Sequence, residues 1–313
     1  MRRLAFPGLL VLVPIAAMTA AFGVSGSGAA ARQHTAAAIG VIAYSDGAAP
    51  GTMSRLRLLN VDGGVSRPLA SRRFAHNASW SPDGTRLVVE DYGARASGAP
   101  KLAVISLRAG SIRRITHASA LDESPDWSPS GDRIVFSRAP LAGRDDGLWV
   151  MSATGGGERH LTYSRFGDTC AIWSPDGRQI AFARYRKSGT RDLWLMRADG
   201  KGQHRIVMRA SCAAWSPDGT RMAIGKLTGR TIGPCGCPAT DLYLTNGGGG
   251  NGQLLIRNGG HPSWSPDGTR IVFFRWQGTR AHLWLINADG TGLRRLTGGP
   301  HSQWAPDWQP APG

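Results

Sequence analysis

Short runs of β-branched and aromatic residues recur along the chain, and turns rich in glycine separate them. Residues 270–274, Arg-Ile-Val-Phe-Phe, are typical of a strand buried on both faces, and residues 283–286, Leu-Trp-Leu-Ile, predict the next strand. Residues 294–297, Arg-Arg-Leu-Thr, predict a more polar edge strand, where charge discourages pairing with other molecules. Because helical periodicity is absent after the N-terminal segment, the pattern predicts an all-β fold.

A repeated block precedes the buried runs. Copies of Trp-Ser-Pro-Asp-Gly, with Ser in place of Asp in the second copy, begin at Trp80, Trp127, Trp173, Trp215 and Trp264. A truncated sixth copy contains Trp308, and successive tryptophans are 42 to 49 residues apart. Ser-Pro-Asp-Gly predicts a β-turn, because proline fixes φ and glycine tolerates the last position. Such a period fits four short strands, so we predict one propeller blade per repeat, with the tryptophans packed between blades.

The last repeat has no strands after it. Three strands predicted near the start of the chain, at residues 39–44, 55–60 and 66–69, lack a first strand. We therefore predict a six-bladed β-propeller whose last blade is closed by these N-terminal strands together with the C-terminal strand around Trp308. Closure of the ring removes the exposed sheet edges that an open array would leave.

The Trp-Ser-Pro-Asp-Gly blocks, with the Leu-Trp-Leu-Met and Ala-Asp-Gly segments that follow them, resemble the TolB-like six-bladed β-propeller repeat, which is related to WD-type repeats. The resemblance covers residues 39–310 and implies the fold, whereas function differs among proteins of this kind. TolB carries an α/β domain before its propeller; here we expect a short linker, residues 32–38, and then the propeller, residues 39–313. Related propellers precede serine peptidase domains, but we expect no hydrolase domain here.

The first 31 residues are predicted to be a secretory signal peptide. Two arginines precede an apolar run, residues 4–24, and Ala29-Ala30-Ala31 meets the small-residue rule for cleavage. An uncleaved membrane anchor is the alternative. We expect a secreted or periplasmic protein, outside the cytoplasm, with peripheral contact with a membrane or none.

The chain is strongly basic, with a formal net charge of +16. This charge favours acidic partners, and the alternative is that arginine is spread over solvent-facing strands. Dense runs of Lys and Arg are absent, which together with secretion argues against nucleic acid as a partner. We expect a monomer that binds a protein or an acidic component of the cell envelope.

The four cysteines are expected to gather on one side of the propeller. Cys170 and Cys212 each lie three residues before a repeat tryptophan, so they occupy equivalent positions on neighbouring blades. Cys235 and Cys237 lie in a long loop of the blade that contains Cys212. For a secreted protein we favour the disulfides Cys170–Cys212 and Cys235–Cys237; a thiolate metal site and free thiols are the alternatives.

Candidate binding residues lie on the face where first strands begin and where second strands join third strands, which we name the loop face. Acidic side chains near the first strands favour Ca²⁺ or a cationic peptide group, or else hydrogen bonds to neighbouring amides. They are Asp122, Glu123, Asp126, Asp168 and Asp307, and His261 lies near them. The ends of the second strands carry a basic arc of Arg138, Arg184, Lys226 and Arg275. This arc favours a carboxylate, phosphate or acidic sugar, or else salt bridges to nearby aspartates.

These features predict a non-catalytic binding or scaffolding propeller whose partner docks at the channel mouth on the loop face. The alternative is an enzyme, a polysaccharide lyase or hydrolase, which acts at the same mouth through a histidine and a metal. The sequence contains no compact set of acid, base and nucleophile, so we assign no catalytic residue. Apart from Ca²⁺, no cofactor is expected.

Overall fold

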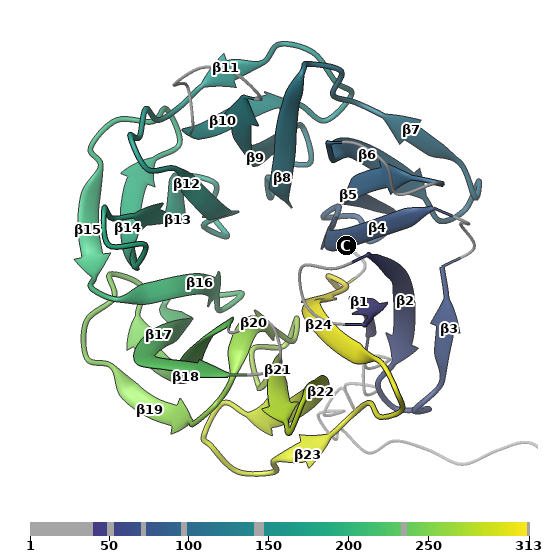
Figure 1. The fold of residues 1–313 in the computed structure, drawn as a ribbon, viewed down its shortest axis with the longest axis vertical. Helices are drawn as coiled ribbons and strands as arrows, with labels where there is room; N and C mark the ends of the chain where they lie inside the picture. Colours follow the sequence, from purple (N-terminus) through teal and green to yellow (C-terminus); the bar gives the residue numbers. More distant parts are fainter. Residues whose placement is uncertain are drawn as a thin grey trace, which may run out of the picture. The chain divides into compact units, whose positions relative to one another are not determined.

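The computed structural model describes residues 40–48, 53–69, 73–94, 99–140, 147–232 and 237–311. Within these residues the chain forms six four-stranded antiparallel sheets arranged in a ring (Figure 1). The predicted all-β, six-bladed propeller is therefore confirmed. The predicted signal peptide and the linker lie outside the described residues. In the described part, no helix has the length and apolar character needed to cross a bilayer.

We number the blades by their repeat tryptophans, from Trp80 in blade 1 to Trp308 in blade 6. Blades 1 to 3 contain β4 (Phe74–Trp80), β5 (Arg86–Gly93), β6 (Lys101–Ser106) and β7 (Ile112–Arg114); β8 (Ala120–Trp127), β9 (Arg133–Pro140), β10 (Gly147–Ser152) and β11 (Arg159–His160); and β12 (Asp168–Trp173), β13 (Gln179–Tyr185), β14 (Arg191–Arg197) and β15 (His204–Val207). Each first strand lies nearest the channel and each fourth strand lies at the rim (Figure 1).

Blades 4 and 5 repeat this order, and blade 6 combines both ends of the chain. Their strands are β16 (Ala210–Trp215), β17 (Arg221–Ile232), β18 (Cys237–Asn246) and β19 (Gln253–Ile256); β20 (Gly260–Trp264), β21 (Arg270–Gln277), β22 (Arg280–Asn287) and β23 (Arg294–Arg295); and β24 (Ser302–Trp308) with β1 (Val41–Gly47), β2 (Ser54–Asn60) and β3 (Ser66–Pro68).

The ring closes as the sequence predicts. In blade 6 the sheet order is β24-β1-β2-β3, and β24 pairs antiparallel with β1 so that Trp308 lies opposite Ile42. The backbone N–H of Gln309 also donates to the carbonyl of Val41 over 2.8 Å. The two ends of the described chain are therefore held together by one continuous ladder.

The Ser-Pro-Asp-Gly blocks form the turns between first and second strands. In blade 1, Asp83 accepts a hydrogen bond from the backbone N–H of Thr85 over 3.0 Å, and Ser81 Oγ accepts one from the N–H of Arg86 over 3.0 Å. Gly84 has φ of +65°, a conformation that glycine adopts without strain. The turn thus reverses the chain direction, so that each second strand runs antiparallel along the outer side of its first strand.

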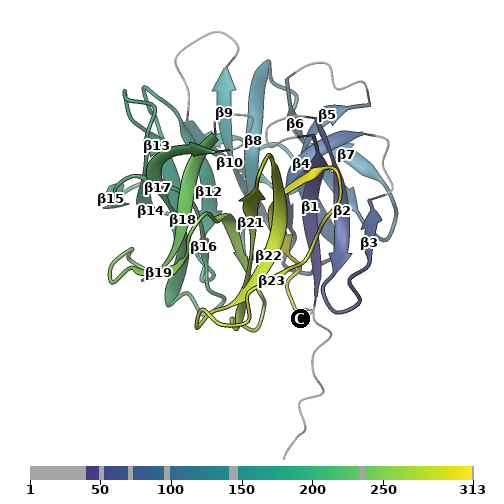
Figure 2. The same cartoon turned by 60° about the horizontal axis from the view of Figure 1, so that its bottom comes forward.

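The core lies between blades rather than inside them. One cluster combines Val88 and Leu102 of blade 1 with Trp127, Ile134 and Phe136 of blade 2, and all five are buried. This arrangement confirms the interpretation of the tryptophans as packing residues. Figure 2 shows the strands running between two opposite faces, so that second strands such as β9 end at the loop face.

Candidate functional site

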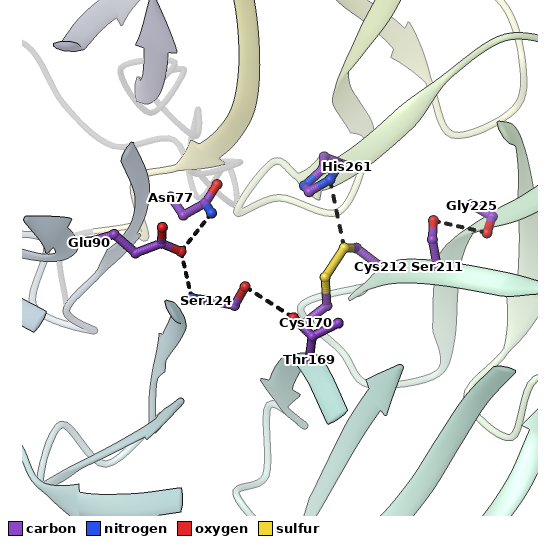
Figure 3. Close-up of a disulfide and its surroundings, with 9 residues drawn as sticks. All are labelled: Asn77, Glu90, Ser124, Thr169, Cys170, Ser211, Cys212, Gly225 and His261. Carbon is purple, nitrogen blue, oxygen red and sulfur yellow. Dashed lines mark hydrogen bonds between the residues drawn. A yellow bond between two sulfur atoms is a disulfide. The ribbon is translucent and has the colours of Figure 1, made fainter. Parts of the chain in front are cut away.

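A β-bulge interrupts every first strand three residues before its tryptophan. Five of the six residues at this position have a left-handed backbone, with φ between +46° and +51°, and the sixth is Cys212. The five are Asn77, Ser124, Cys170, His261 and Ala305. All six line a cavity of about 130 Å³ in the central channel, and Figure 3 shows several of them around its mouth. The repeat therefore places one variable side chain per blade around the channel.

A disulfide joins two of these positions. Cys170 on β12 is bonded to Cys212 on β16, which links blades 3 and 4 and confirms the predicted pairing (Figure 3). The sulfur of Cys212 also lies 3.7 Å from Nε2 of His261 in blade 5. Burial, and then the charge of Arg191, lower the pKa of His261 to about 4, so its imidazole is neutral at pH 7. Cys235 lies outside the described residues, and its pairing with Cys237 stays a prediction.

Hydrogen bonds also join neighbouring first strands, two residues after each bulge, at four of the six places where blades meet. Asp126 of blade 2 accepts from the backbone N–H of Trp173 in blade 3 over 2.8 Å. Asp307 of blade 6 accepts from the N–H of Trp80 in blade 1 over 2.9 Å. In the same way, hydroxyl groups accept from the next blade's tryptophan N–H, from Trp127 to Ser79 and from Trp308 to Ser263. We name these four contacts the inter-blade relay.

The relay is interrupted at blades 3 and 4. The equivalent residues there are Ile172 and Ala214, whose side chains cannot accept a hydrogen bond. The first gap lies between blades 3 and 4, where the Cys170–Cys212 disulfide connects the same two strands. The disulfide therefore joins blades 3 and 4 where the relay contact between them is missing. It connects the two blades and also forms part of the channel wall.

Asp126 and Asp307 titrate unusually. Both keep some exposed surface in the channel cavity, yet the surrounding protein disfavours their charged forms. Desolvation raises the pKa of Asp126 to about 7, with a further contribution from Asp307, and raises the pKa of Asp307 to about 6. The hydrogen bonds that both accept identify them first as inter-blade contacts, the alternative that the sequence left open.

A polar cluster that the sequence analysis missed lies on the side of blades 1 and 2. Glu90 on β5 is 1% exposed and accepts hydrogen bonds from Asn77 Nδ2 over 2.7 Å and from the N–H of Ser124 over 2.6 Å (Figure 3). Its other oxygen lies 2.7 Å from Nε2 of His76, which is also 3.0 Å from the hydroxyl of Tyr92. The available signal was an acidic residue inside the otherwise apolar run Leu-Val-Val-Glu.

Glu123 lies beside this cluster. Burial, and then the negative charge of Glu90, raise the pKa of Glu123. Within the described residues, no hydrogen bond or ion pair to its carboxylate is found, in contrast to Glu90. A buried carboxylate without a hydrogen bond or ion pair would be stabilised by a cationic or hydrogen-bond-donating group of a binding partner.

The basic arc divides into two halves. Arg138 is paired with Asp122, through Nε at 2.6 Å, and with Glu158, and only 6% of its side chain is exposed. Arg184 donates to both oxygens of Asp168, each over 2.8 Å. The structure thus brings Asp122 and Asp168 onto two of the predicted anion-binding arginines, and each pair is neutral.

The other half of the arc keeps its charge. Lys226 lies over the ring of Tyr243 at 4.8 Å, and Arg275 lies over Trp284 at 5.4 Å. Ala210 faces Lys226 in the ladder, whereas Asp122 and Asp168 face the arginines of blades 2 and 3. Neither Lys226 nor Arg275 has a carboxylate within 4.0 Å among the residues that the structure describes.

The same part of the chain contains no group of three or more His, Cys, Asp or Glu side chains placed to hold a metal ion. The acidic residues considered for Ca²⁺ are divided instead among ion pairs, backbone amides and the isolated Glu123.

Comparison with known proteins agrees with this architecture. TolB from Acinetobacter baumannii is 20% identical and aligns over 88% of this chain and 67% of that chain, with a TM-score of 0.73. A structure of a nidogen/laminin complex aligns over 87% of this chain and 98% of that chain at 8% identity and a TM-score of 0.67. An oligogalacturonate lyase in complex with manganese aligns over 74% of this chain and 70% of that chain at 16% identity and a TM-score of 0.52.

These identities show a shared fold. A comparison with curated proteins found no match. A family model described as the TolB beta propeller domain matches residues 41–312, which include all the described strands and the channel-mouth residues. The chain therefore belongs to the family of TolB β-propeller domains.

Proposed function

We propose that this propeller is a non-catalytic binding protein of the cell envelope or exterior, and that it holds a segment of a partner protein at the loop-face mouth of its channel. One observation carries the proposal: Glu123 is a largely buried carboxylate that forms no hydrogen bond or ion pair in the described part of the chain, and among the charges that act on its pKa only that of His76 favours the ionised form. A lysine, an arginine or an amino group from a docked segment would compensate its charge. The Asn77–Glu90–Ser124 hydrogen bonds hold the adjacent wall rigid for such docking.

The opposite side of the ring supports a second contact. Lys226 and Arg275, in blades 4 and 5, are the members of the basic arc without an ion pair, and they can receive a carboxylate of the partner. A segment that carries both signs of charge would therefore be oriented, because reversing it would place like charges together. Arg138 and Arg184 are excluded from this role by their own aspartates.

Two further observations are consistent with this role. The Cys170–Cys212 disulfide is typical of proteins that fold in an oxidising compartment, which supports a location outside the cytoplasm. A protein of the same fold occurs in the nidogen/laminin complex, so a propeller of this architecture is compatible with a protein partner.

The test is a pull-down from cell-envelope extract with the propeller, residues 38–313, as bait. We expect a retained partner whose recovery falls at least about tenfold with Glu123→Gln or with Lys226→Glu/Arg275→Glu, because each change removes one charged contact. Asp289→Asn is the matched control, since Asp289 is an exposed carboxylate in a turn after a third strand, on the face opposite the loops.

Equal recovery by the wild-type and Glu123→Gln proteins would contradict the proposal. Cleavage of oligogalacturonate by the wild-type protein, followed by the appearance of unsaturated products, would instead support the alternative lyase function. In that case, loss of cleavage in His76→Ala would assign the His76–Glu90–Tyr92 cluster to the reaction.

A further inference from the structure

Blade 6 differs from blades 2 to 5 at one position of its third strand. In those four blades an aromatic side chain lies beneath the cation at the end of the second strand, and these side chains are Trp149, Trp194, Tyr243 and Trp284. The strand pairing puts Arg57 at this position in blade 6 and Asp46 in place of the cation. In blade 6 an acidic side chain therefore replaces the cation, and an arginine replaces the aromatic ring.

A polar cavity of about 230 Å³ lies at this place, between blade 6 and the segment that connects blade 5 to β24. Its wall from blade 6 includes Asp46, Arg57, Ser66 and Gln303, and its wall from the connecting segment includes Pro300 and His301. In Figure 1 this segment, drawn in yellow between β23 and β24, runs beside the strands of blade 6. The cavity thus lies at the position where blades 2 to 5 carry an aromatic ring.

The hydrogen bonds fix these side chains in place. Arg57 donates from Nε to Ser66 Oγ over 2.8 Å and from Nη2 to the Ser66 carbonyl over 3.2 Å, and the hydroxyl of Tyr44 lies 2.6 Å from Ser66 Oγ. Asp46 accepts from Gln303 Nε2 over 3.2 Å. Asp46 Oδ2 lies 3.8 Å from Arg57 Nε, and Asp46 Oδ1 lies 3.6 Å from Nδ1 of His301, which also lines the cavity. These contacts are longer than a hydrogen bond, so Asp46 and Arg57 keep capacity for a ligand.

The charges define the class of ligand. An anion would be repelled by Asp46 and a cation by Arg57, since these groups are neighbours in one small cavity. A pair of vicinal hydroxyl groups suits both, because hydroxyls donate to a carboxylate and accept from a guanidinium. Leu296 and Pro300, which keep exposed surface, also line the cavity and offer an apolar surface to the C–H face of a sugar ring.

We propose that this cavity, which we name the blade 6 pocket, binds a neutral pyranose sugar through Asp46 and Arg57. The site is separate from the channel mouth and does not depend on the function proposed above. It would give the propeller a contact with glycan while a protein segment occupies the channel mouth.

The experiment is saturation-transfer NMR on the propeller with methyl α-glucopyranoside, methyl β-galactopyranoside, N-acetylglucosamine and glucuronate as probes. We expect saturation transfer to at least one neutral sugar, and at least about tenfold weaker binding by Arg57→Trp, because the new ring fills the pocket as in blades 2 to 5. Arg67→Trp is the matched control: Arg67 lies next to Ser66 on β3, is exposed and does not line the pocket.

A second variant keeps the proposal testable if Arg57→Trp fails to fold. Asp46→Asn preserves the shape of the side chain but removes its charge, and we expect it to weaken binding of the neutral sugar several-fold. The proposal is overturned if no neutral sugar receives saturation, if Arg57→Trp binds as the wild type does, or if glucuronate binds more tightly than the neutral sugars.

Discussion

Aspartates at two positions of the repeat, the turn and the channel wall, have pKa values shifted in opposite directions. In the turns, hydrogen bonds from serine and threonine groups lower the pKa of Asp83 and of Asp218 to about 2. In the channel wall, burial raises the pKa of Asp126 to about 7 although it accepts several hydrogen bonds. Desolvation thus outweighs hydrogen bonding in the wall, whereas at the exposed turns little desolvation opposes the hydrogen bonds.

The raised pKa of Asp126 predicts a pH dependence of stability. Between the unfolded pKa of about 4 and the folded value of about 7, the native carboxyl holds a proton that the unfolded chain has released. Its contribution is therefore fully present below about pH 4 and is lost as the pH rises through about 7. We expect the free energy of unfolding, measured with urea from pH 5 to 8, to fall less with pH in Asp126→Asn than in the wild type.

His261 changes the pH dependence of stability in the opposite direction from Asp126, and it does so equally in the wild type and in Asp126→Asn. Its folded pKa of about 4 lies below the ordinary 6.5, so it reduces stability as the pH falls from about 6.5 towards 4. Because both proteins contain His261, the difference between their pH profiles isolates Asp126. Identical slopes in the two proteins would mean that Asp126 is charged in the native state throughout this range.

At the scale of strands, the first strand of each blade both packs the ring and shapes its channel. The bulge exposes a variable residue to the channel, and the relay two residues further along joins it to the next blade. At the gap that Ile172 leaves between blades 3 and 4, the Cys170–Cys212 disulfide supplies a covalent connection. We infer that blades 3 and 4 depend on this bond more than the other blades depend on any single hydrogen bond.

Removing the disulfide is therefore expected to destabilise the propeller. The two cysteines are 42 residues apart, and the chain-entropy relation for a loop of this size gives about 4 kcal/mol. We expect Cys170→Ser/Cys212→Ser to lower the free energy of unfolding in urea by up to this amount. Ser79→Ala, which removes one relay contact, should cost only about 1 kcal/mol.

The redox state gives a second control. A reducing agent should destabilise the wild type and should leave the stability of the double variant unchanged, unless Cys235 and Cys237 also contribute. If the double variant were as stable as the wild type, the disulfide would not replace the missing relay contacts.

At the scale of the whole molecule, stability depends on contacts between residues at opposite ends of the sequence. Trp308 packs with Ile42, Tyr44 and Leu285 in a cluster between blades 5 and 6. Asp307 bonds to the N–H of Trp80, 227 residues away. The ring therefore closes only when β24 docks beside β1.

Truncation before β24 tests this dependence. We expect a chain that ends at Pro300 to lose its cooperative thermal transition, because Ile42 and Val41 lose their partner strand and the ring has an open edge. Circular dichroism at increasing temperature would measure the loss, and a synthetic peptide of residues 301–311 should restore the transition. A chain that ends at Gln309, which retains all of β24, is the control and should unfold as the full chain does.

If the peptide restores the cooperative transition, the pairing of β24 with β1 is what the truncated chain lacks, and the shorter length of the chain is not the cause. If the chain ending at Pro300 unfolded cooperatively at the wild-type temperature, the pairing of β24 with β1 would not be needed for closure.

The repeat made most of the fold predictable. The order of the strands, the turns and the closing blade follow from local patterns, since each Trp-Ser-Pro-Asp-Gly block specifies its own turn and each buried run its own strand. The strand ends were less predictable: residues 39–44 were expected as a strand, and β1 spans Val41–Gly47. The equivalence of Cys170 and Cys212 also follows from counting along the repeat. The site was less predictable because partners such as Glu90 and Ser124 lie on different blades and share no motif.

The sequence by itself determined the propeller, its six blades, its closure and the equivalent positions of Cys170 and Cys212, because these depend on local chemistry that recurs every 42 to 49 residues. Only the tertiary structure decided which charges remain available. Arg138 and Lys226 occupy equivalent positions, yet one is neutralised by Asp122 and the other faces Ala210. The energy of a charge depends on groups brought near it by folding, and a linear pattern of residue types does not contain those distances.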